Sequence, residues 1–136
     1  MIGQLMNSIS RLDLEPTDKL IINSIKLNQA NRNEDLSWFI RMLNRTRPPY
    51  TYMIDASWGD GKTFFLKSAE LVLKVLNPNI DTSNIETNQI ESFLDNLIDV
   101  NEPILPFYFN AWENDYAEEP LTALLANMAI EFNSLE

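Results

Sequence analysis

Apolar side chains recur at helical spacing in three stretches of the chain. Between Asn33, a suitable N-cap, and the pair Pro48-Pro49, they fall at positions i, i+3, i+4 and i+7. The second stretch runs from residue 62 to Asn77-Pro78-Asn79, and the third follows Pro120. The predicted inner faces comprise Leu36, Phe39, Ile40 and Leu43, then Phe65, Ala69, Val72, Leu73 and Leu76, and finally Leu121, Leu124, Leu125, Met128, Ala129 and Phe132. Three amphipathic helices are therefore predicted.

Two shorter apolar runs predict β-strands. Residues 50–54 follow the proline pair, and residues 104–109 contain Pro106, which cannot donate to a ladder and so favours an edge position. Strand, loop and helix between residues 50 and 76 make the first unit of a parallel α/β sheet. Residues 19–27 fit either a strand or a helix. Residues 79–103 hold one helical piece with the apolar stripe Ile90, Phe93, Leu94, Leu97 and Ile98 and an acidic outer side, which we interpret as solvated.

A phosphate-binding loop is predicted between the first strand and its helix. The segment from Ala56 to Thr63 fits the pattern G-x-x-x-x-G-K-[ST], except that Ala56 occupies the first glycine position. In such a loop backbone N–H groups face the phosphates, Lys62 reaches the β and γ phosphates, and the Thr63 hydroxyl ligates Mg²⁺. The predicted nucleotide-binding residues are Ala56, Ser57, Trp58, Gly59, Asp60, Gly61, Lys62, Thr63 and Phe64, with Lys62 as the catalytic one. The alternative is a turn that contains Gly-Lys-Thr by chance.

Side chains near the loop are open to more than one interpretation. Asp60 is expected to point into solvent, because a carboxylate would repel the phosphates. Trp58 is either a plug over the adjoining core, which we favour, or a lid near the ligand. Arg41 and Arg45 lie off the helical stripe and are interpreted as a solvated face rather than as nucleotide contacts.

Composition narrows the possible functions. With 136 residues, 45% of them hydrophobic, the chain suits one domain with a buried core. A net charge of −10 argues against nucleic acid as the main ligand. The chain has no Cys and no His, which excludes disulfides, thiolate nucleophiles, imidazole bases and the usual zinc sites. No signal peptide or membrane span is recognised, so a cytoplasmic location is expected.

The loop and a second motif together resemble the KAP family of P-loop NTPases. The residues that carry the resemblance are Trp58 to Leu66 and, further on, Phe109-Asn110-Ala111-Trp112 with Glu113. It covers roughly residue 33 to the end. Residues 1–32 are therefore interpreted as a peripheral N-terminal segment, and residues 33–136 as the N-terminal portion of a KAP-type domain. The resemblance makes Asn110 and Trp112 family-signature positions beside the nucleotide core.

The resemblance implies an α/β fold of the additional-strand class, a P-loop NTPase with flanking helices that binds ATP and Mg²⁺, and bacterial relatives linked to phage defence. Such enzymes need a Walker B strand that ends in acidic residues, and no strand of this sequence after Trp112 ends that way. Little or no hydrolysis is therefore expected from this chain alone. In the implied strand order 5-1-4-3-2 the two predicted strands are not neighbours, so the parallel sheet is expected to be incomplete. The hypothesis is the first piece of a longer NTPase. The alternative is that the two predicted strands pair directly, or that a partner chain supplies the rest of the sheet.

Two other functions remain open. The chain fits an interaction or regulatory protein that retains the loop only as structure, in which case the exposed apolar helix faces would bind a protein partner. A small-molecule kinase fits less well, because it would need a lid and an acceptor site. Nucleotide affinity separates the first two, since a structural corner has no reason to bind ATP.

Overall fold

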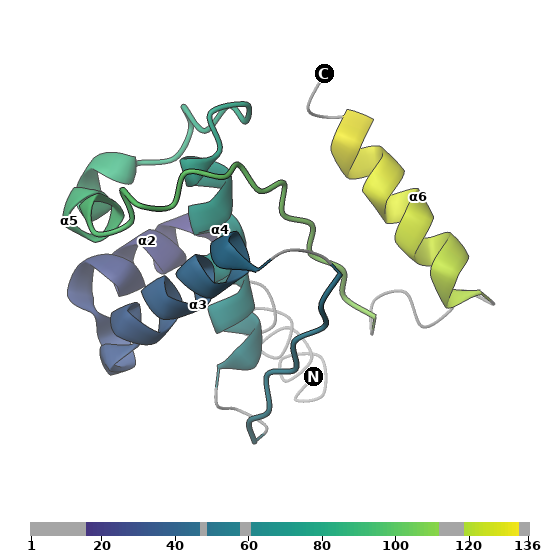
Figure 1. Ribbon diagram of the computed structural model, residues 1–136, viewed down its shortest axis with the longest axis horizontal. Coiled ribbons are helices and arrows are strands. Elements are labelled where there is room, and N and C mark those ends of the chain that lie inside the picture. The colour runs from purple at the N-terminus through teal and green to yellow at the C-terminus, as the bar shows by residue number, and fades with distance from the viewer. Residues whose placement is uncertain (1–15, 47–48, 58–60, 112–118, 134–136) are drawn as a thin grey trace, which may run out of the picture.

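The computed structural model describes residues 16–46, 49–57, 61–111 and 119–133 (Figure 1). Its helical elements are α2 (Asp18–Leu27), the short 3-10 turn η1 (Gln29–Asn31), α3 (Asn33–Arg45), α4 (Lys62–Leu76), the 3-10 turn η2 (Thr87–Ile90), α5 (Glu91–Asp95) and α6 (Pro120–Asn133). Helix α4 packs against both α2 and α3, and η2 packs against α2 and α5. Figure 1 shows these elements as one cluster, with α6 set apart from it.

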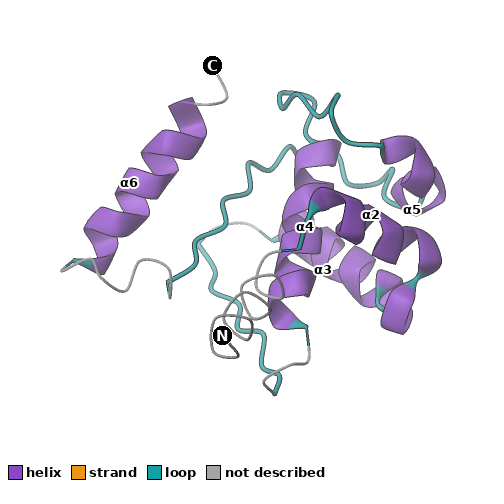
Figure 2. Cartoon of the chain, turned by 180° about the vertical axis from the view of Figure 1, so that it is seen from behind, coloured by secondary structure: helices purple, strands orange, loops and turns teal. Residues whose placement is uncertain are grey.

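The predicted parallel sheet is wrong: the described residues contain no β-strand (Figure 2). A strand is stable only when its backbone groups pair with a neighbouring strand. The predicted strands at residues 50–54 and 104–109 were not expected to be neighbours, so neither supplies the ladder of the other. Pro103 and Pro106 also remove two donors from the second segment. Both segments therefore run as irregular chain, and Met53 is 90% exposed. The α/β fold class of the sequence analysis is thus corrected to a helical one.

The two central helices agree with the predicted periodicity. In α3, Leu36 and Ile40 are buried, while Phe39 and Leu43 pack against the core from partly buried positions. In α4, the predicted Ala69, Val72 and Leu73 are buried, and the chain leaves the helix at Asn77 as expected. The aromatic rings of Phe39 and Phe65 join the two helices, with their centroids 5.5 Å apart. The 3.6-residue period therefore identified the core-facing side of each helix.

Residues 19–27, which fit a strand or a helix equally well, lie in α2. Thr17 is the N-cap, and its hydroxyl accepts a hydrogen bond from the Leu20 N–H at 3.3 Å. Asp18 in the first turn and Lys26 in the last complement the helix dipole. The buried side chains Ile21, Ile22 and Ile25 pack in the same core as α3 and α4. Local capping and burial thus fix a helix where the apolar pattern was too short to decide.

The acidic stretch before residue 103 is attached to α3 by side-chain contacts. Arg41 and Arg45 both pair with the Asp99 carboxylate, at 3.4 and 3.5 Å. Arg41 also donates to the Asn96 carbonyl, and the Asn44 amide donates to the Glu102 carbonyl at 2.8 Å. The two arginines therefore hold the loop after α5. In this region Ile90, Phe93 and Leu97 are buried as predicted, whereas Ile98 is 80% exposed.

Helix α6 is the least covered of the helices. None of its residues is buried, and the predicted inner-face residues Leu121 and Leu125 are 65% and 55% exposed. Contacts between described residues that connect it to the rest of the chain include the pair Lys74–Glu131 at 3.3 Å and the rings of Phe107 and Phe132, which lie 6.5 Å apart. Across the described residues, no helix has the length and apolar character needed to cross a bilayer.

The attachment of α6 is expected to weaken at high pH. Burial alone would lower the pKa of Lys74, but the Glu70 and Glu131 carboxylates outweigh it and raise this pKa above 10.5. A lysine whose pKa is raised on folding stabilises the native state below its unfolded pKa and loses that contribution as pH rises through the folded value. The free energy of unfolding should therefore fall above pH 10.5 more steeply in the wild type than in Lys74→Met, as measured by urea titration. Parallel pH profiles for the two proteins would contradict this assignment.

Candidate functional site

Gly61 forms the junction between the predicted phosphate loop and α4. Its φ of 81° and ψ of 27° place it in the left-handed region, and it is the N-cap of the helix. A Cβ built at this position would meet no atom within 4 Å. The position therefore requires glycine for its backbone angle rather than for lack of space. The Gly61 carbonyl accepts the first helical hydrogen bond, from the Phe65 N–H at 2.9 Å.

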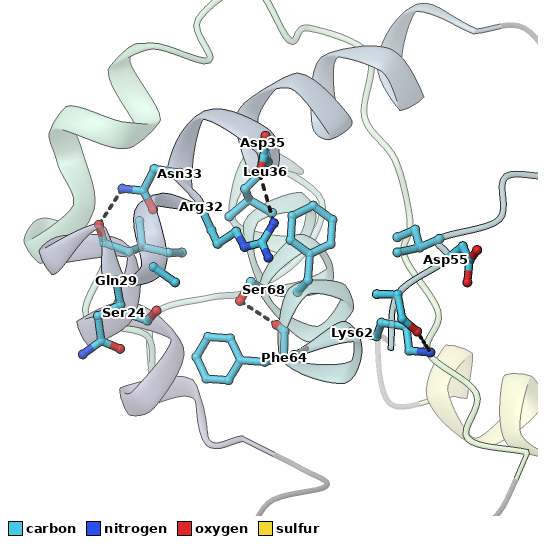
Figure 3. A pocket seen from close by; sticks show the side chains of 16 residues that line it. Ser24, Gln29, Arg32, Asn33, Asp35, Leu36, Asp55, Lys62, Phe64 and Ser68 are labelled. Carbon is cyan, nitrogen blue, oxygen red and sulfur yellow. Dashed lines mark hydrogen bonds and ion pairs between the residues drawn. The ribbon is translucent and has the colours of Figure 1, made fainter. Parts of the chain in front are cut away.

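Lys62 connects the two ends of the loop. Its Nζ donates a hydrogen bond to the Ala56 carbonyl at 2.7 Å (Figure 3). The side chain is partly buried, so this ammonium group is held beside the loop backbone rather than free in solvent. This contact places a positive charge beside the Ala56 carbonyl.

The start of α4 is favourable for an anion. Its N-cap residue, Gly61, has no side chain that could cap the first N–H groups, and the first turn carries no acidic residue. Unpaired N–H groups and the helix dipole make such an end electropositive. Thr63 is the second residue of the helix and is partly exposed. Figure 3 shows the Asp55 carboxylate directed away from the α4 helix, so this acidic side chain does not point into the helix start.

The structure brings together the predicted nucleotide-binding residues that it describes. Ala56, Ser57, Gly61, Lys62, Thr63 and Phe64 lie in the loop and the first turn of α4. The predicted Trp58, Gly59, Asp60 and Trp112 lie outside the described residues. Asn110 is partly buried and directly follows the irregular segment 104–109. It does not line the pocket described below. Within the described part of the chain, no cluster of acidic residues has the arrangement of a metal site.

A pocket of about 420 Å³ adjoins the loop. The loop side contributes Ile54, Asp55, Ala56, Gly61 and Lys62, and α4 contributes Phe64, Phe65 and Ser68. The opposite wall is formed by α2, η1 and the start of α3, and comprises Ser24, Ile25, Gln29, Ala30, Arg32, Asn33, Asp35 and Leu36 (Figure 3). The pocket therefore extends from the predicted phosphate site to the turn between α2 and α3.

The turn between α2 and α3 is fixed by side-chain hydrogen bonds. The Asn33 amide donates to the Ile25 carbonyl at 2.7 Å, and the Asn33 N–H donates to the Asn28 side chain at 3.1 Å. The Asn28 amide in turn donates to the Asn31 side chain at 3.2 Å. Asn28, Ala30 and Asn31 all have positive φ, which is uncommon for residues other than glycine. Asn33, predicted as an N-cap, thus lies one residue inside α3 and braces this turn instead.

The KAP family P-loop domain matches residues 32–135 of this chain. The chain belongs to the KAP family. Searches among curated proteins and solved structures returned no match. Membership of a P-loop NTPase family indicates nucleotide binding, and the match begins at Arg32, on the wall of the pocket.

Sequence reasoning missed the far wall of this KAP pocket. Residues 1–32 were interpreted as peripheral, yet Ser24, Gln29 and Ala30 face the same pocket as Lys62. Asparagine at positions 28 and 31 is typical of left-handed backbone and was an available signal for a turn. Nothing in the pattern indicates Ala30 as a third such position, because alanine has no preference for positive φ.

Exchanging Gly61 is expected to destabilise the KAP domain in proportion to the cost of positive φ. Gly61→Ala should lower the free energy of unfolding by about 1–2 kcal/mol, because an L-residue in this region clashes with its own backbone. Gly61→Asn should cost less, since asparagine tolerates this conformation. Urea titration followed by far-UV circular dichroism measures both. Equal stability of glycine, asparagine and alanine at this position would contradict a left-handed residue 61.

Proposed function

We propose that this KAP chain binds ATP, with the loop of residues 56–63 around the phosphates. The observation that carries the proposal is a contact of Lys62, the first residue of α4. Its ammonium group lies 2.7 Å from the Ala56 carbonyl. A triphosphate entering the loop would exchange this neutral acceptor for charged phosphate oxygens, which make stronger hydrogen bonds to an ammonium group. Lys62 would then contact the β and γ phosphates.

Mg²⁺ would accompany the nucleotide. Its preferred ligands are oxygens, and it usually keeps several waters and takes phosphate oxygens as further ligands. The Thr63 hydroxyl is the protein ligand that this proposal assigns, and it follows Lys62 directly at the helix start. A site with one hydroxyl and no described acidic cluster fits an ion that arrives with the nucleotide rather than one held by protein alone. ATP as the ligand makes the cytoplasm the proposed location.

Calorimetric titration of the chain with Mg-ATP and with a non-hydrolysable analogue tests this function. We expect saturable binding of both ligands, and weaker binding when Mg²⁺ is removed by a chelator. Far-UV circular dichroism on the same sample establishes that the protein is helical. A helical sample that binds neither ligand would overturn the proposal.

One observation favours a protein-binding function as the second candidate. Helix α6 exposes Leu121, Leu125 and Ile130, at 65%, 55% and 71% of their surface. Exposed apolar side chains along one helix are typical of a surface that binds another protein. On this alternative the loop is a structural corner, and the titration above would show no ATP binding while the chain remains folded.

A further inference from the structure

We infer that the pocket between the α2–α3 turn and α4 receives the adenine and ribose of the nucleotide whose phosphates occupy the loop. This inference rests on the proposed ATP binding and adds where and how the nucleoside is held. It gives a binding role to residues of α2 and η1, which lie before residue 32, where the family match begins.

The pocket is continuous with the loop. Ala56, Gly61 and Lys62 line it at one end, and Ser68 lines it further along α4. Six residues of α-helix separate Lys62 from Ser68, a rise of about 9 Å. The pocket is therefore within reach of a nucleoside that is joined to phosphates at the start of α4. Its volume of about 420 Å³ falls in the range of small-molecule sites.

The α4 wall offers flat apolar surface. Phe64 and Phe65, at consecutive positions of α4, both line the pocket, and Figure 3 shows the Phe64 ring beside the helix. Phe65 is held by Phe39, whose ring centroid lies 5.5 Å away, whereas Phe64 is partly buried without such a ring contact in the described chain. Aromatic rings stack on the faces of nucleic-acid bases. Phe64 is therefore assigned to the base, and Phe65 to the structural support behind it.

The turn wall offers polar groups at the rim. Gln29 is exposed and lines the pocket, and its side-chain amide has both a donor and an acceptor. This pair complements the amino group and a ring nitrogen of adenine. Arg32 pairs with Asp35 at 3.3 Å, but both side chains are more than half exposed, so the pair contributes little and leaves the guanidinium available to a ligand.

The turn is prearranged for this role. The hydrogen bonds among Asn28, Asn31 and Asn33 hold Gln29 and Arg32 at the edge of the pocket before any ligand enters. A wall that is already ordered reduces the entropy cost of binding. Asn33 itself is committed to the Ile25 carbonyl and serves as a brace rather than as a base contact.

Comparison of Mg-ATP with inorganic triphosphate tests the inference, because the second probe carries no nucleoside. Phe64→Leu, which keeps apolar volume and loses the ring, should weaken ATP binding about ten-fold. Gln29→Ala should weaken it about five-fold. Both variants should bind triphosphate as the wild type does. Lys26→Ala, an exposed change on α2 outside the pocket, is the matched control and should alter neither affinity.

Each outcome separates this inference from the proposed function. If ATP and triphosphate both bind but Phe64→Leu and Gln29→Ala change the two affinities equally or not at all, the nucleoside does not occupy this pocket and ATP binding stands. If neither probe binds the folded wild type, both proposals fail. Gln29 is exposed, so its truncation leaves the core intact and keeps the test decisive if Phe64→Leu lowers stability.

Discussion

Exchange of Lys62 for methionine is expected to weaken Mg-ATP binding about 100-fold. An ammonium group that donates to phosphate oxygens contributes about 3 kcal/mol, near the upper range for hydrogen bonds to charged groups, and 1.4 kcal/mol corresponds to a factor of ten. Methionine keeps the length of the apolar stem, so the packing of the first turn of α4 is preserved. In the free protein the change removes the hydrogen bond to the Ala56 carbonyl. Calorimetric titration with Mg-ATP measures the loss.

Lys67→Met is the matched control for this exchange. Lys67 lies on the same helix, pairs with Glu70 at 3.2 Å and lies 4.1 Å from the centroid of the Tyr108 ring. It does not line the pocket, so its removal changes the net charge by the same amount without touching the proposed phosphate site. The affinity of Lys67→Met for ATP should stay within about two-fold of wild type, because the lost ammonium group lies outside the pocket. Equal losses in the two variants would attribute the effect to overall charge and contradict the role of Lys62.

Exchange of Ile40 for alanine is expected to produce the largest loss of stability. The Ile40 side chain is 0% exposed and lies on α3, which packs against α4. Removal of a fully buried isoleucine costs about 3 kcal/mol, from lost burial together with the cavity left behind. The midpoint of thermal unfolding should fall by roughly 10 °C. Thermal melts followed by circular dichroism measure the change.

Trp38→Ala provides the comparison on the same helix. Trp38 is larger than Ile40, but it is 64% exposed. Its removal should alter the free energy of unfolding by no more than about 0.5 kcal/mol, as is usual for surface positions. A larger effect for Trp38 than for Ile40 would mean that α3 presents a different face to the core than the structure indicates.

The sequence predicted α3 and α4 well because the apolar pattern of each helix lies within one continuous segment. Leu36 and Ile40 on α3, like Ala69 and Val72 on α4, recur at helical spacing over three turns or more. Such a stripe determines both the element and its buried face, because a helix forms its hydrogen bonds within one segment. The exposed α6 shows the limit of this reasoning: its apolar pattern predicted the helix correctly but not its exposure.

The irregular course of the two predicted strands could not be predicted from local pattern. Residues 50–54 have strand-like composition, but a strand depends on partners that are distant in sequence. The pocket wall was equally hidden, because it depends on the left-handed backbone of Ala30 and on contacts between α2 and α4. The predicted loop and helix agree with the structure at one point, because α4 begins at Lys62, directly after Gly61. The binding of phosphate by this loop stays a prediction.

The exposed side chains of the irregular segment and of α6 also bear on how the isolated chain behaves in concentrated solution. Tyr50 and Met53 are 69% and 90% exposed, and Leu121 is 65% exposed. At neutral pH the net charge of −10 keeps copies apart by mutual repulsion. That repulsion vanishes near the isoelectric point of about 4.3, where these apolar surfaces have nothing to oppose their contact. Colloidal stability of the chain is thus set by its carboxylates, and light scattering should rise as the buffer is acidified toward that value.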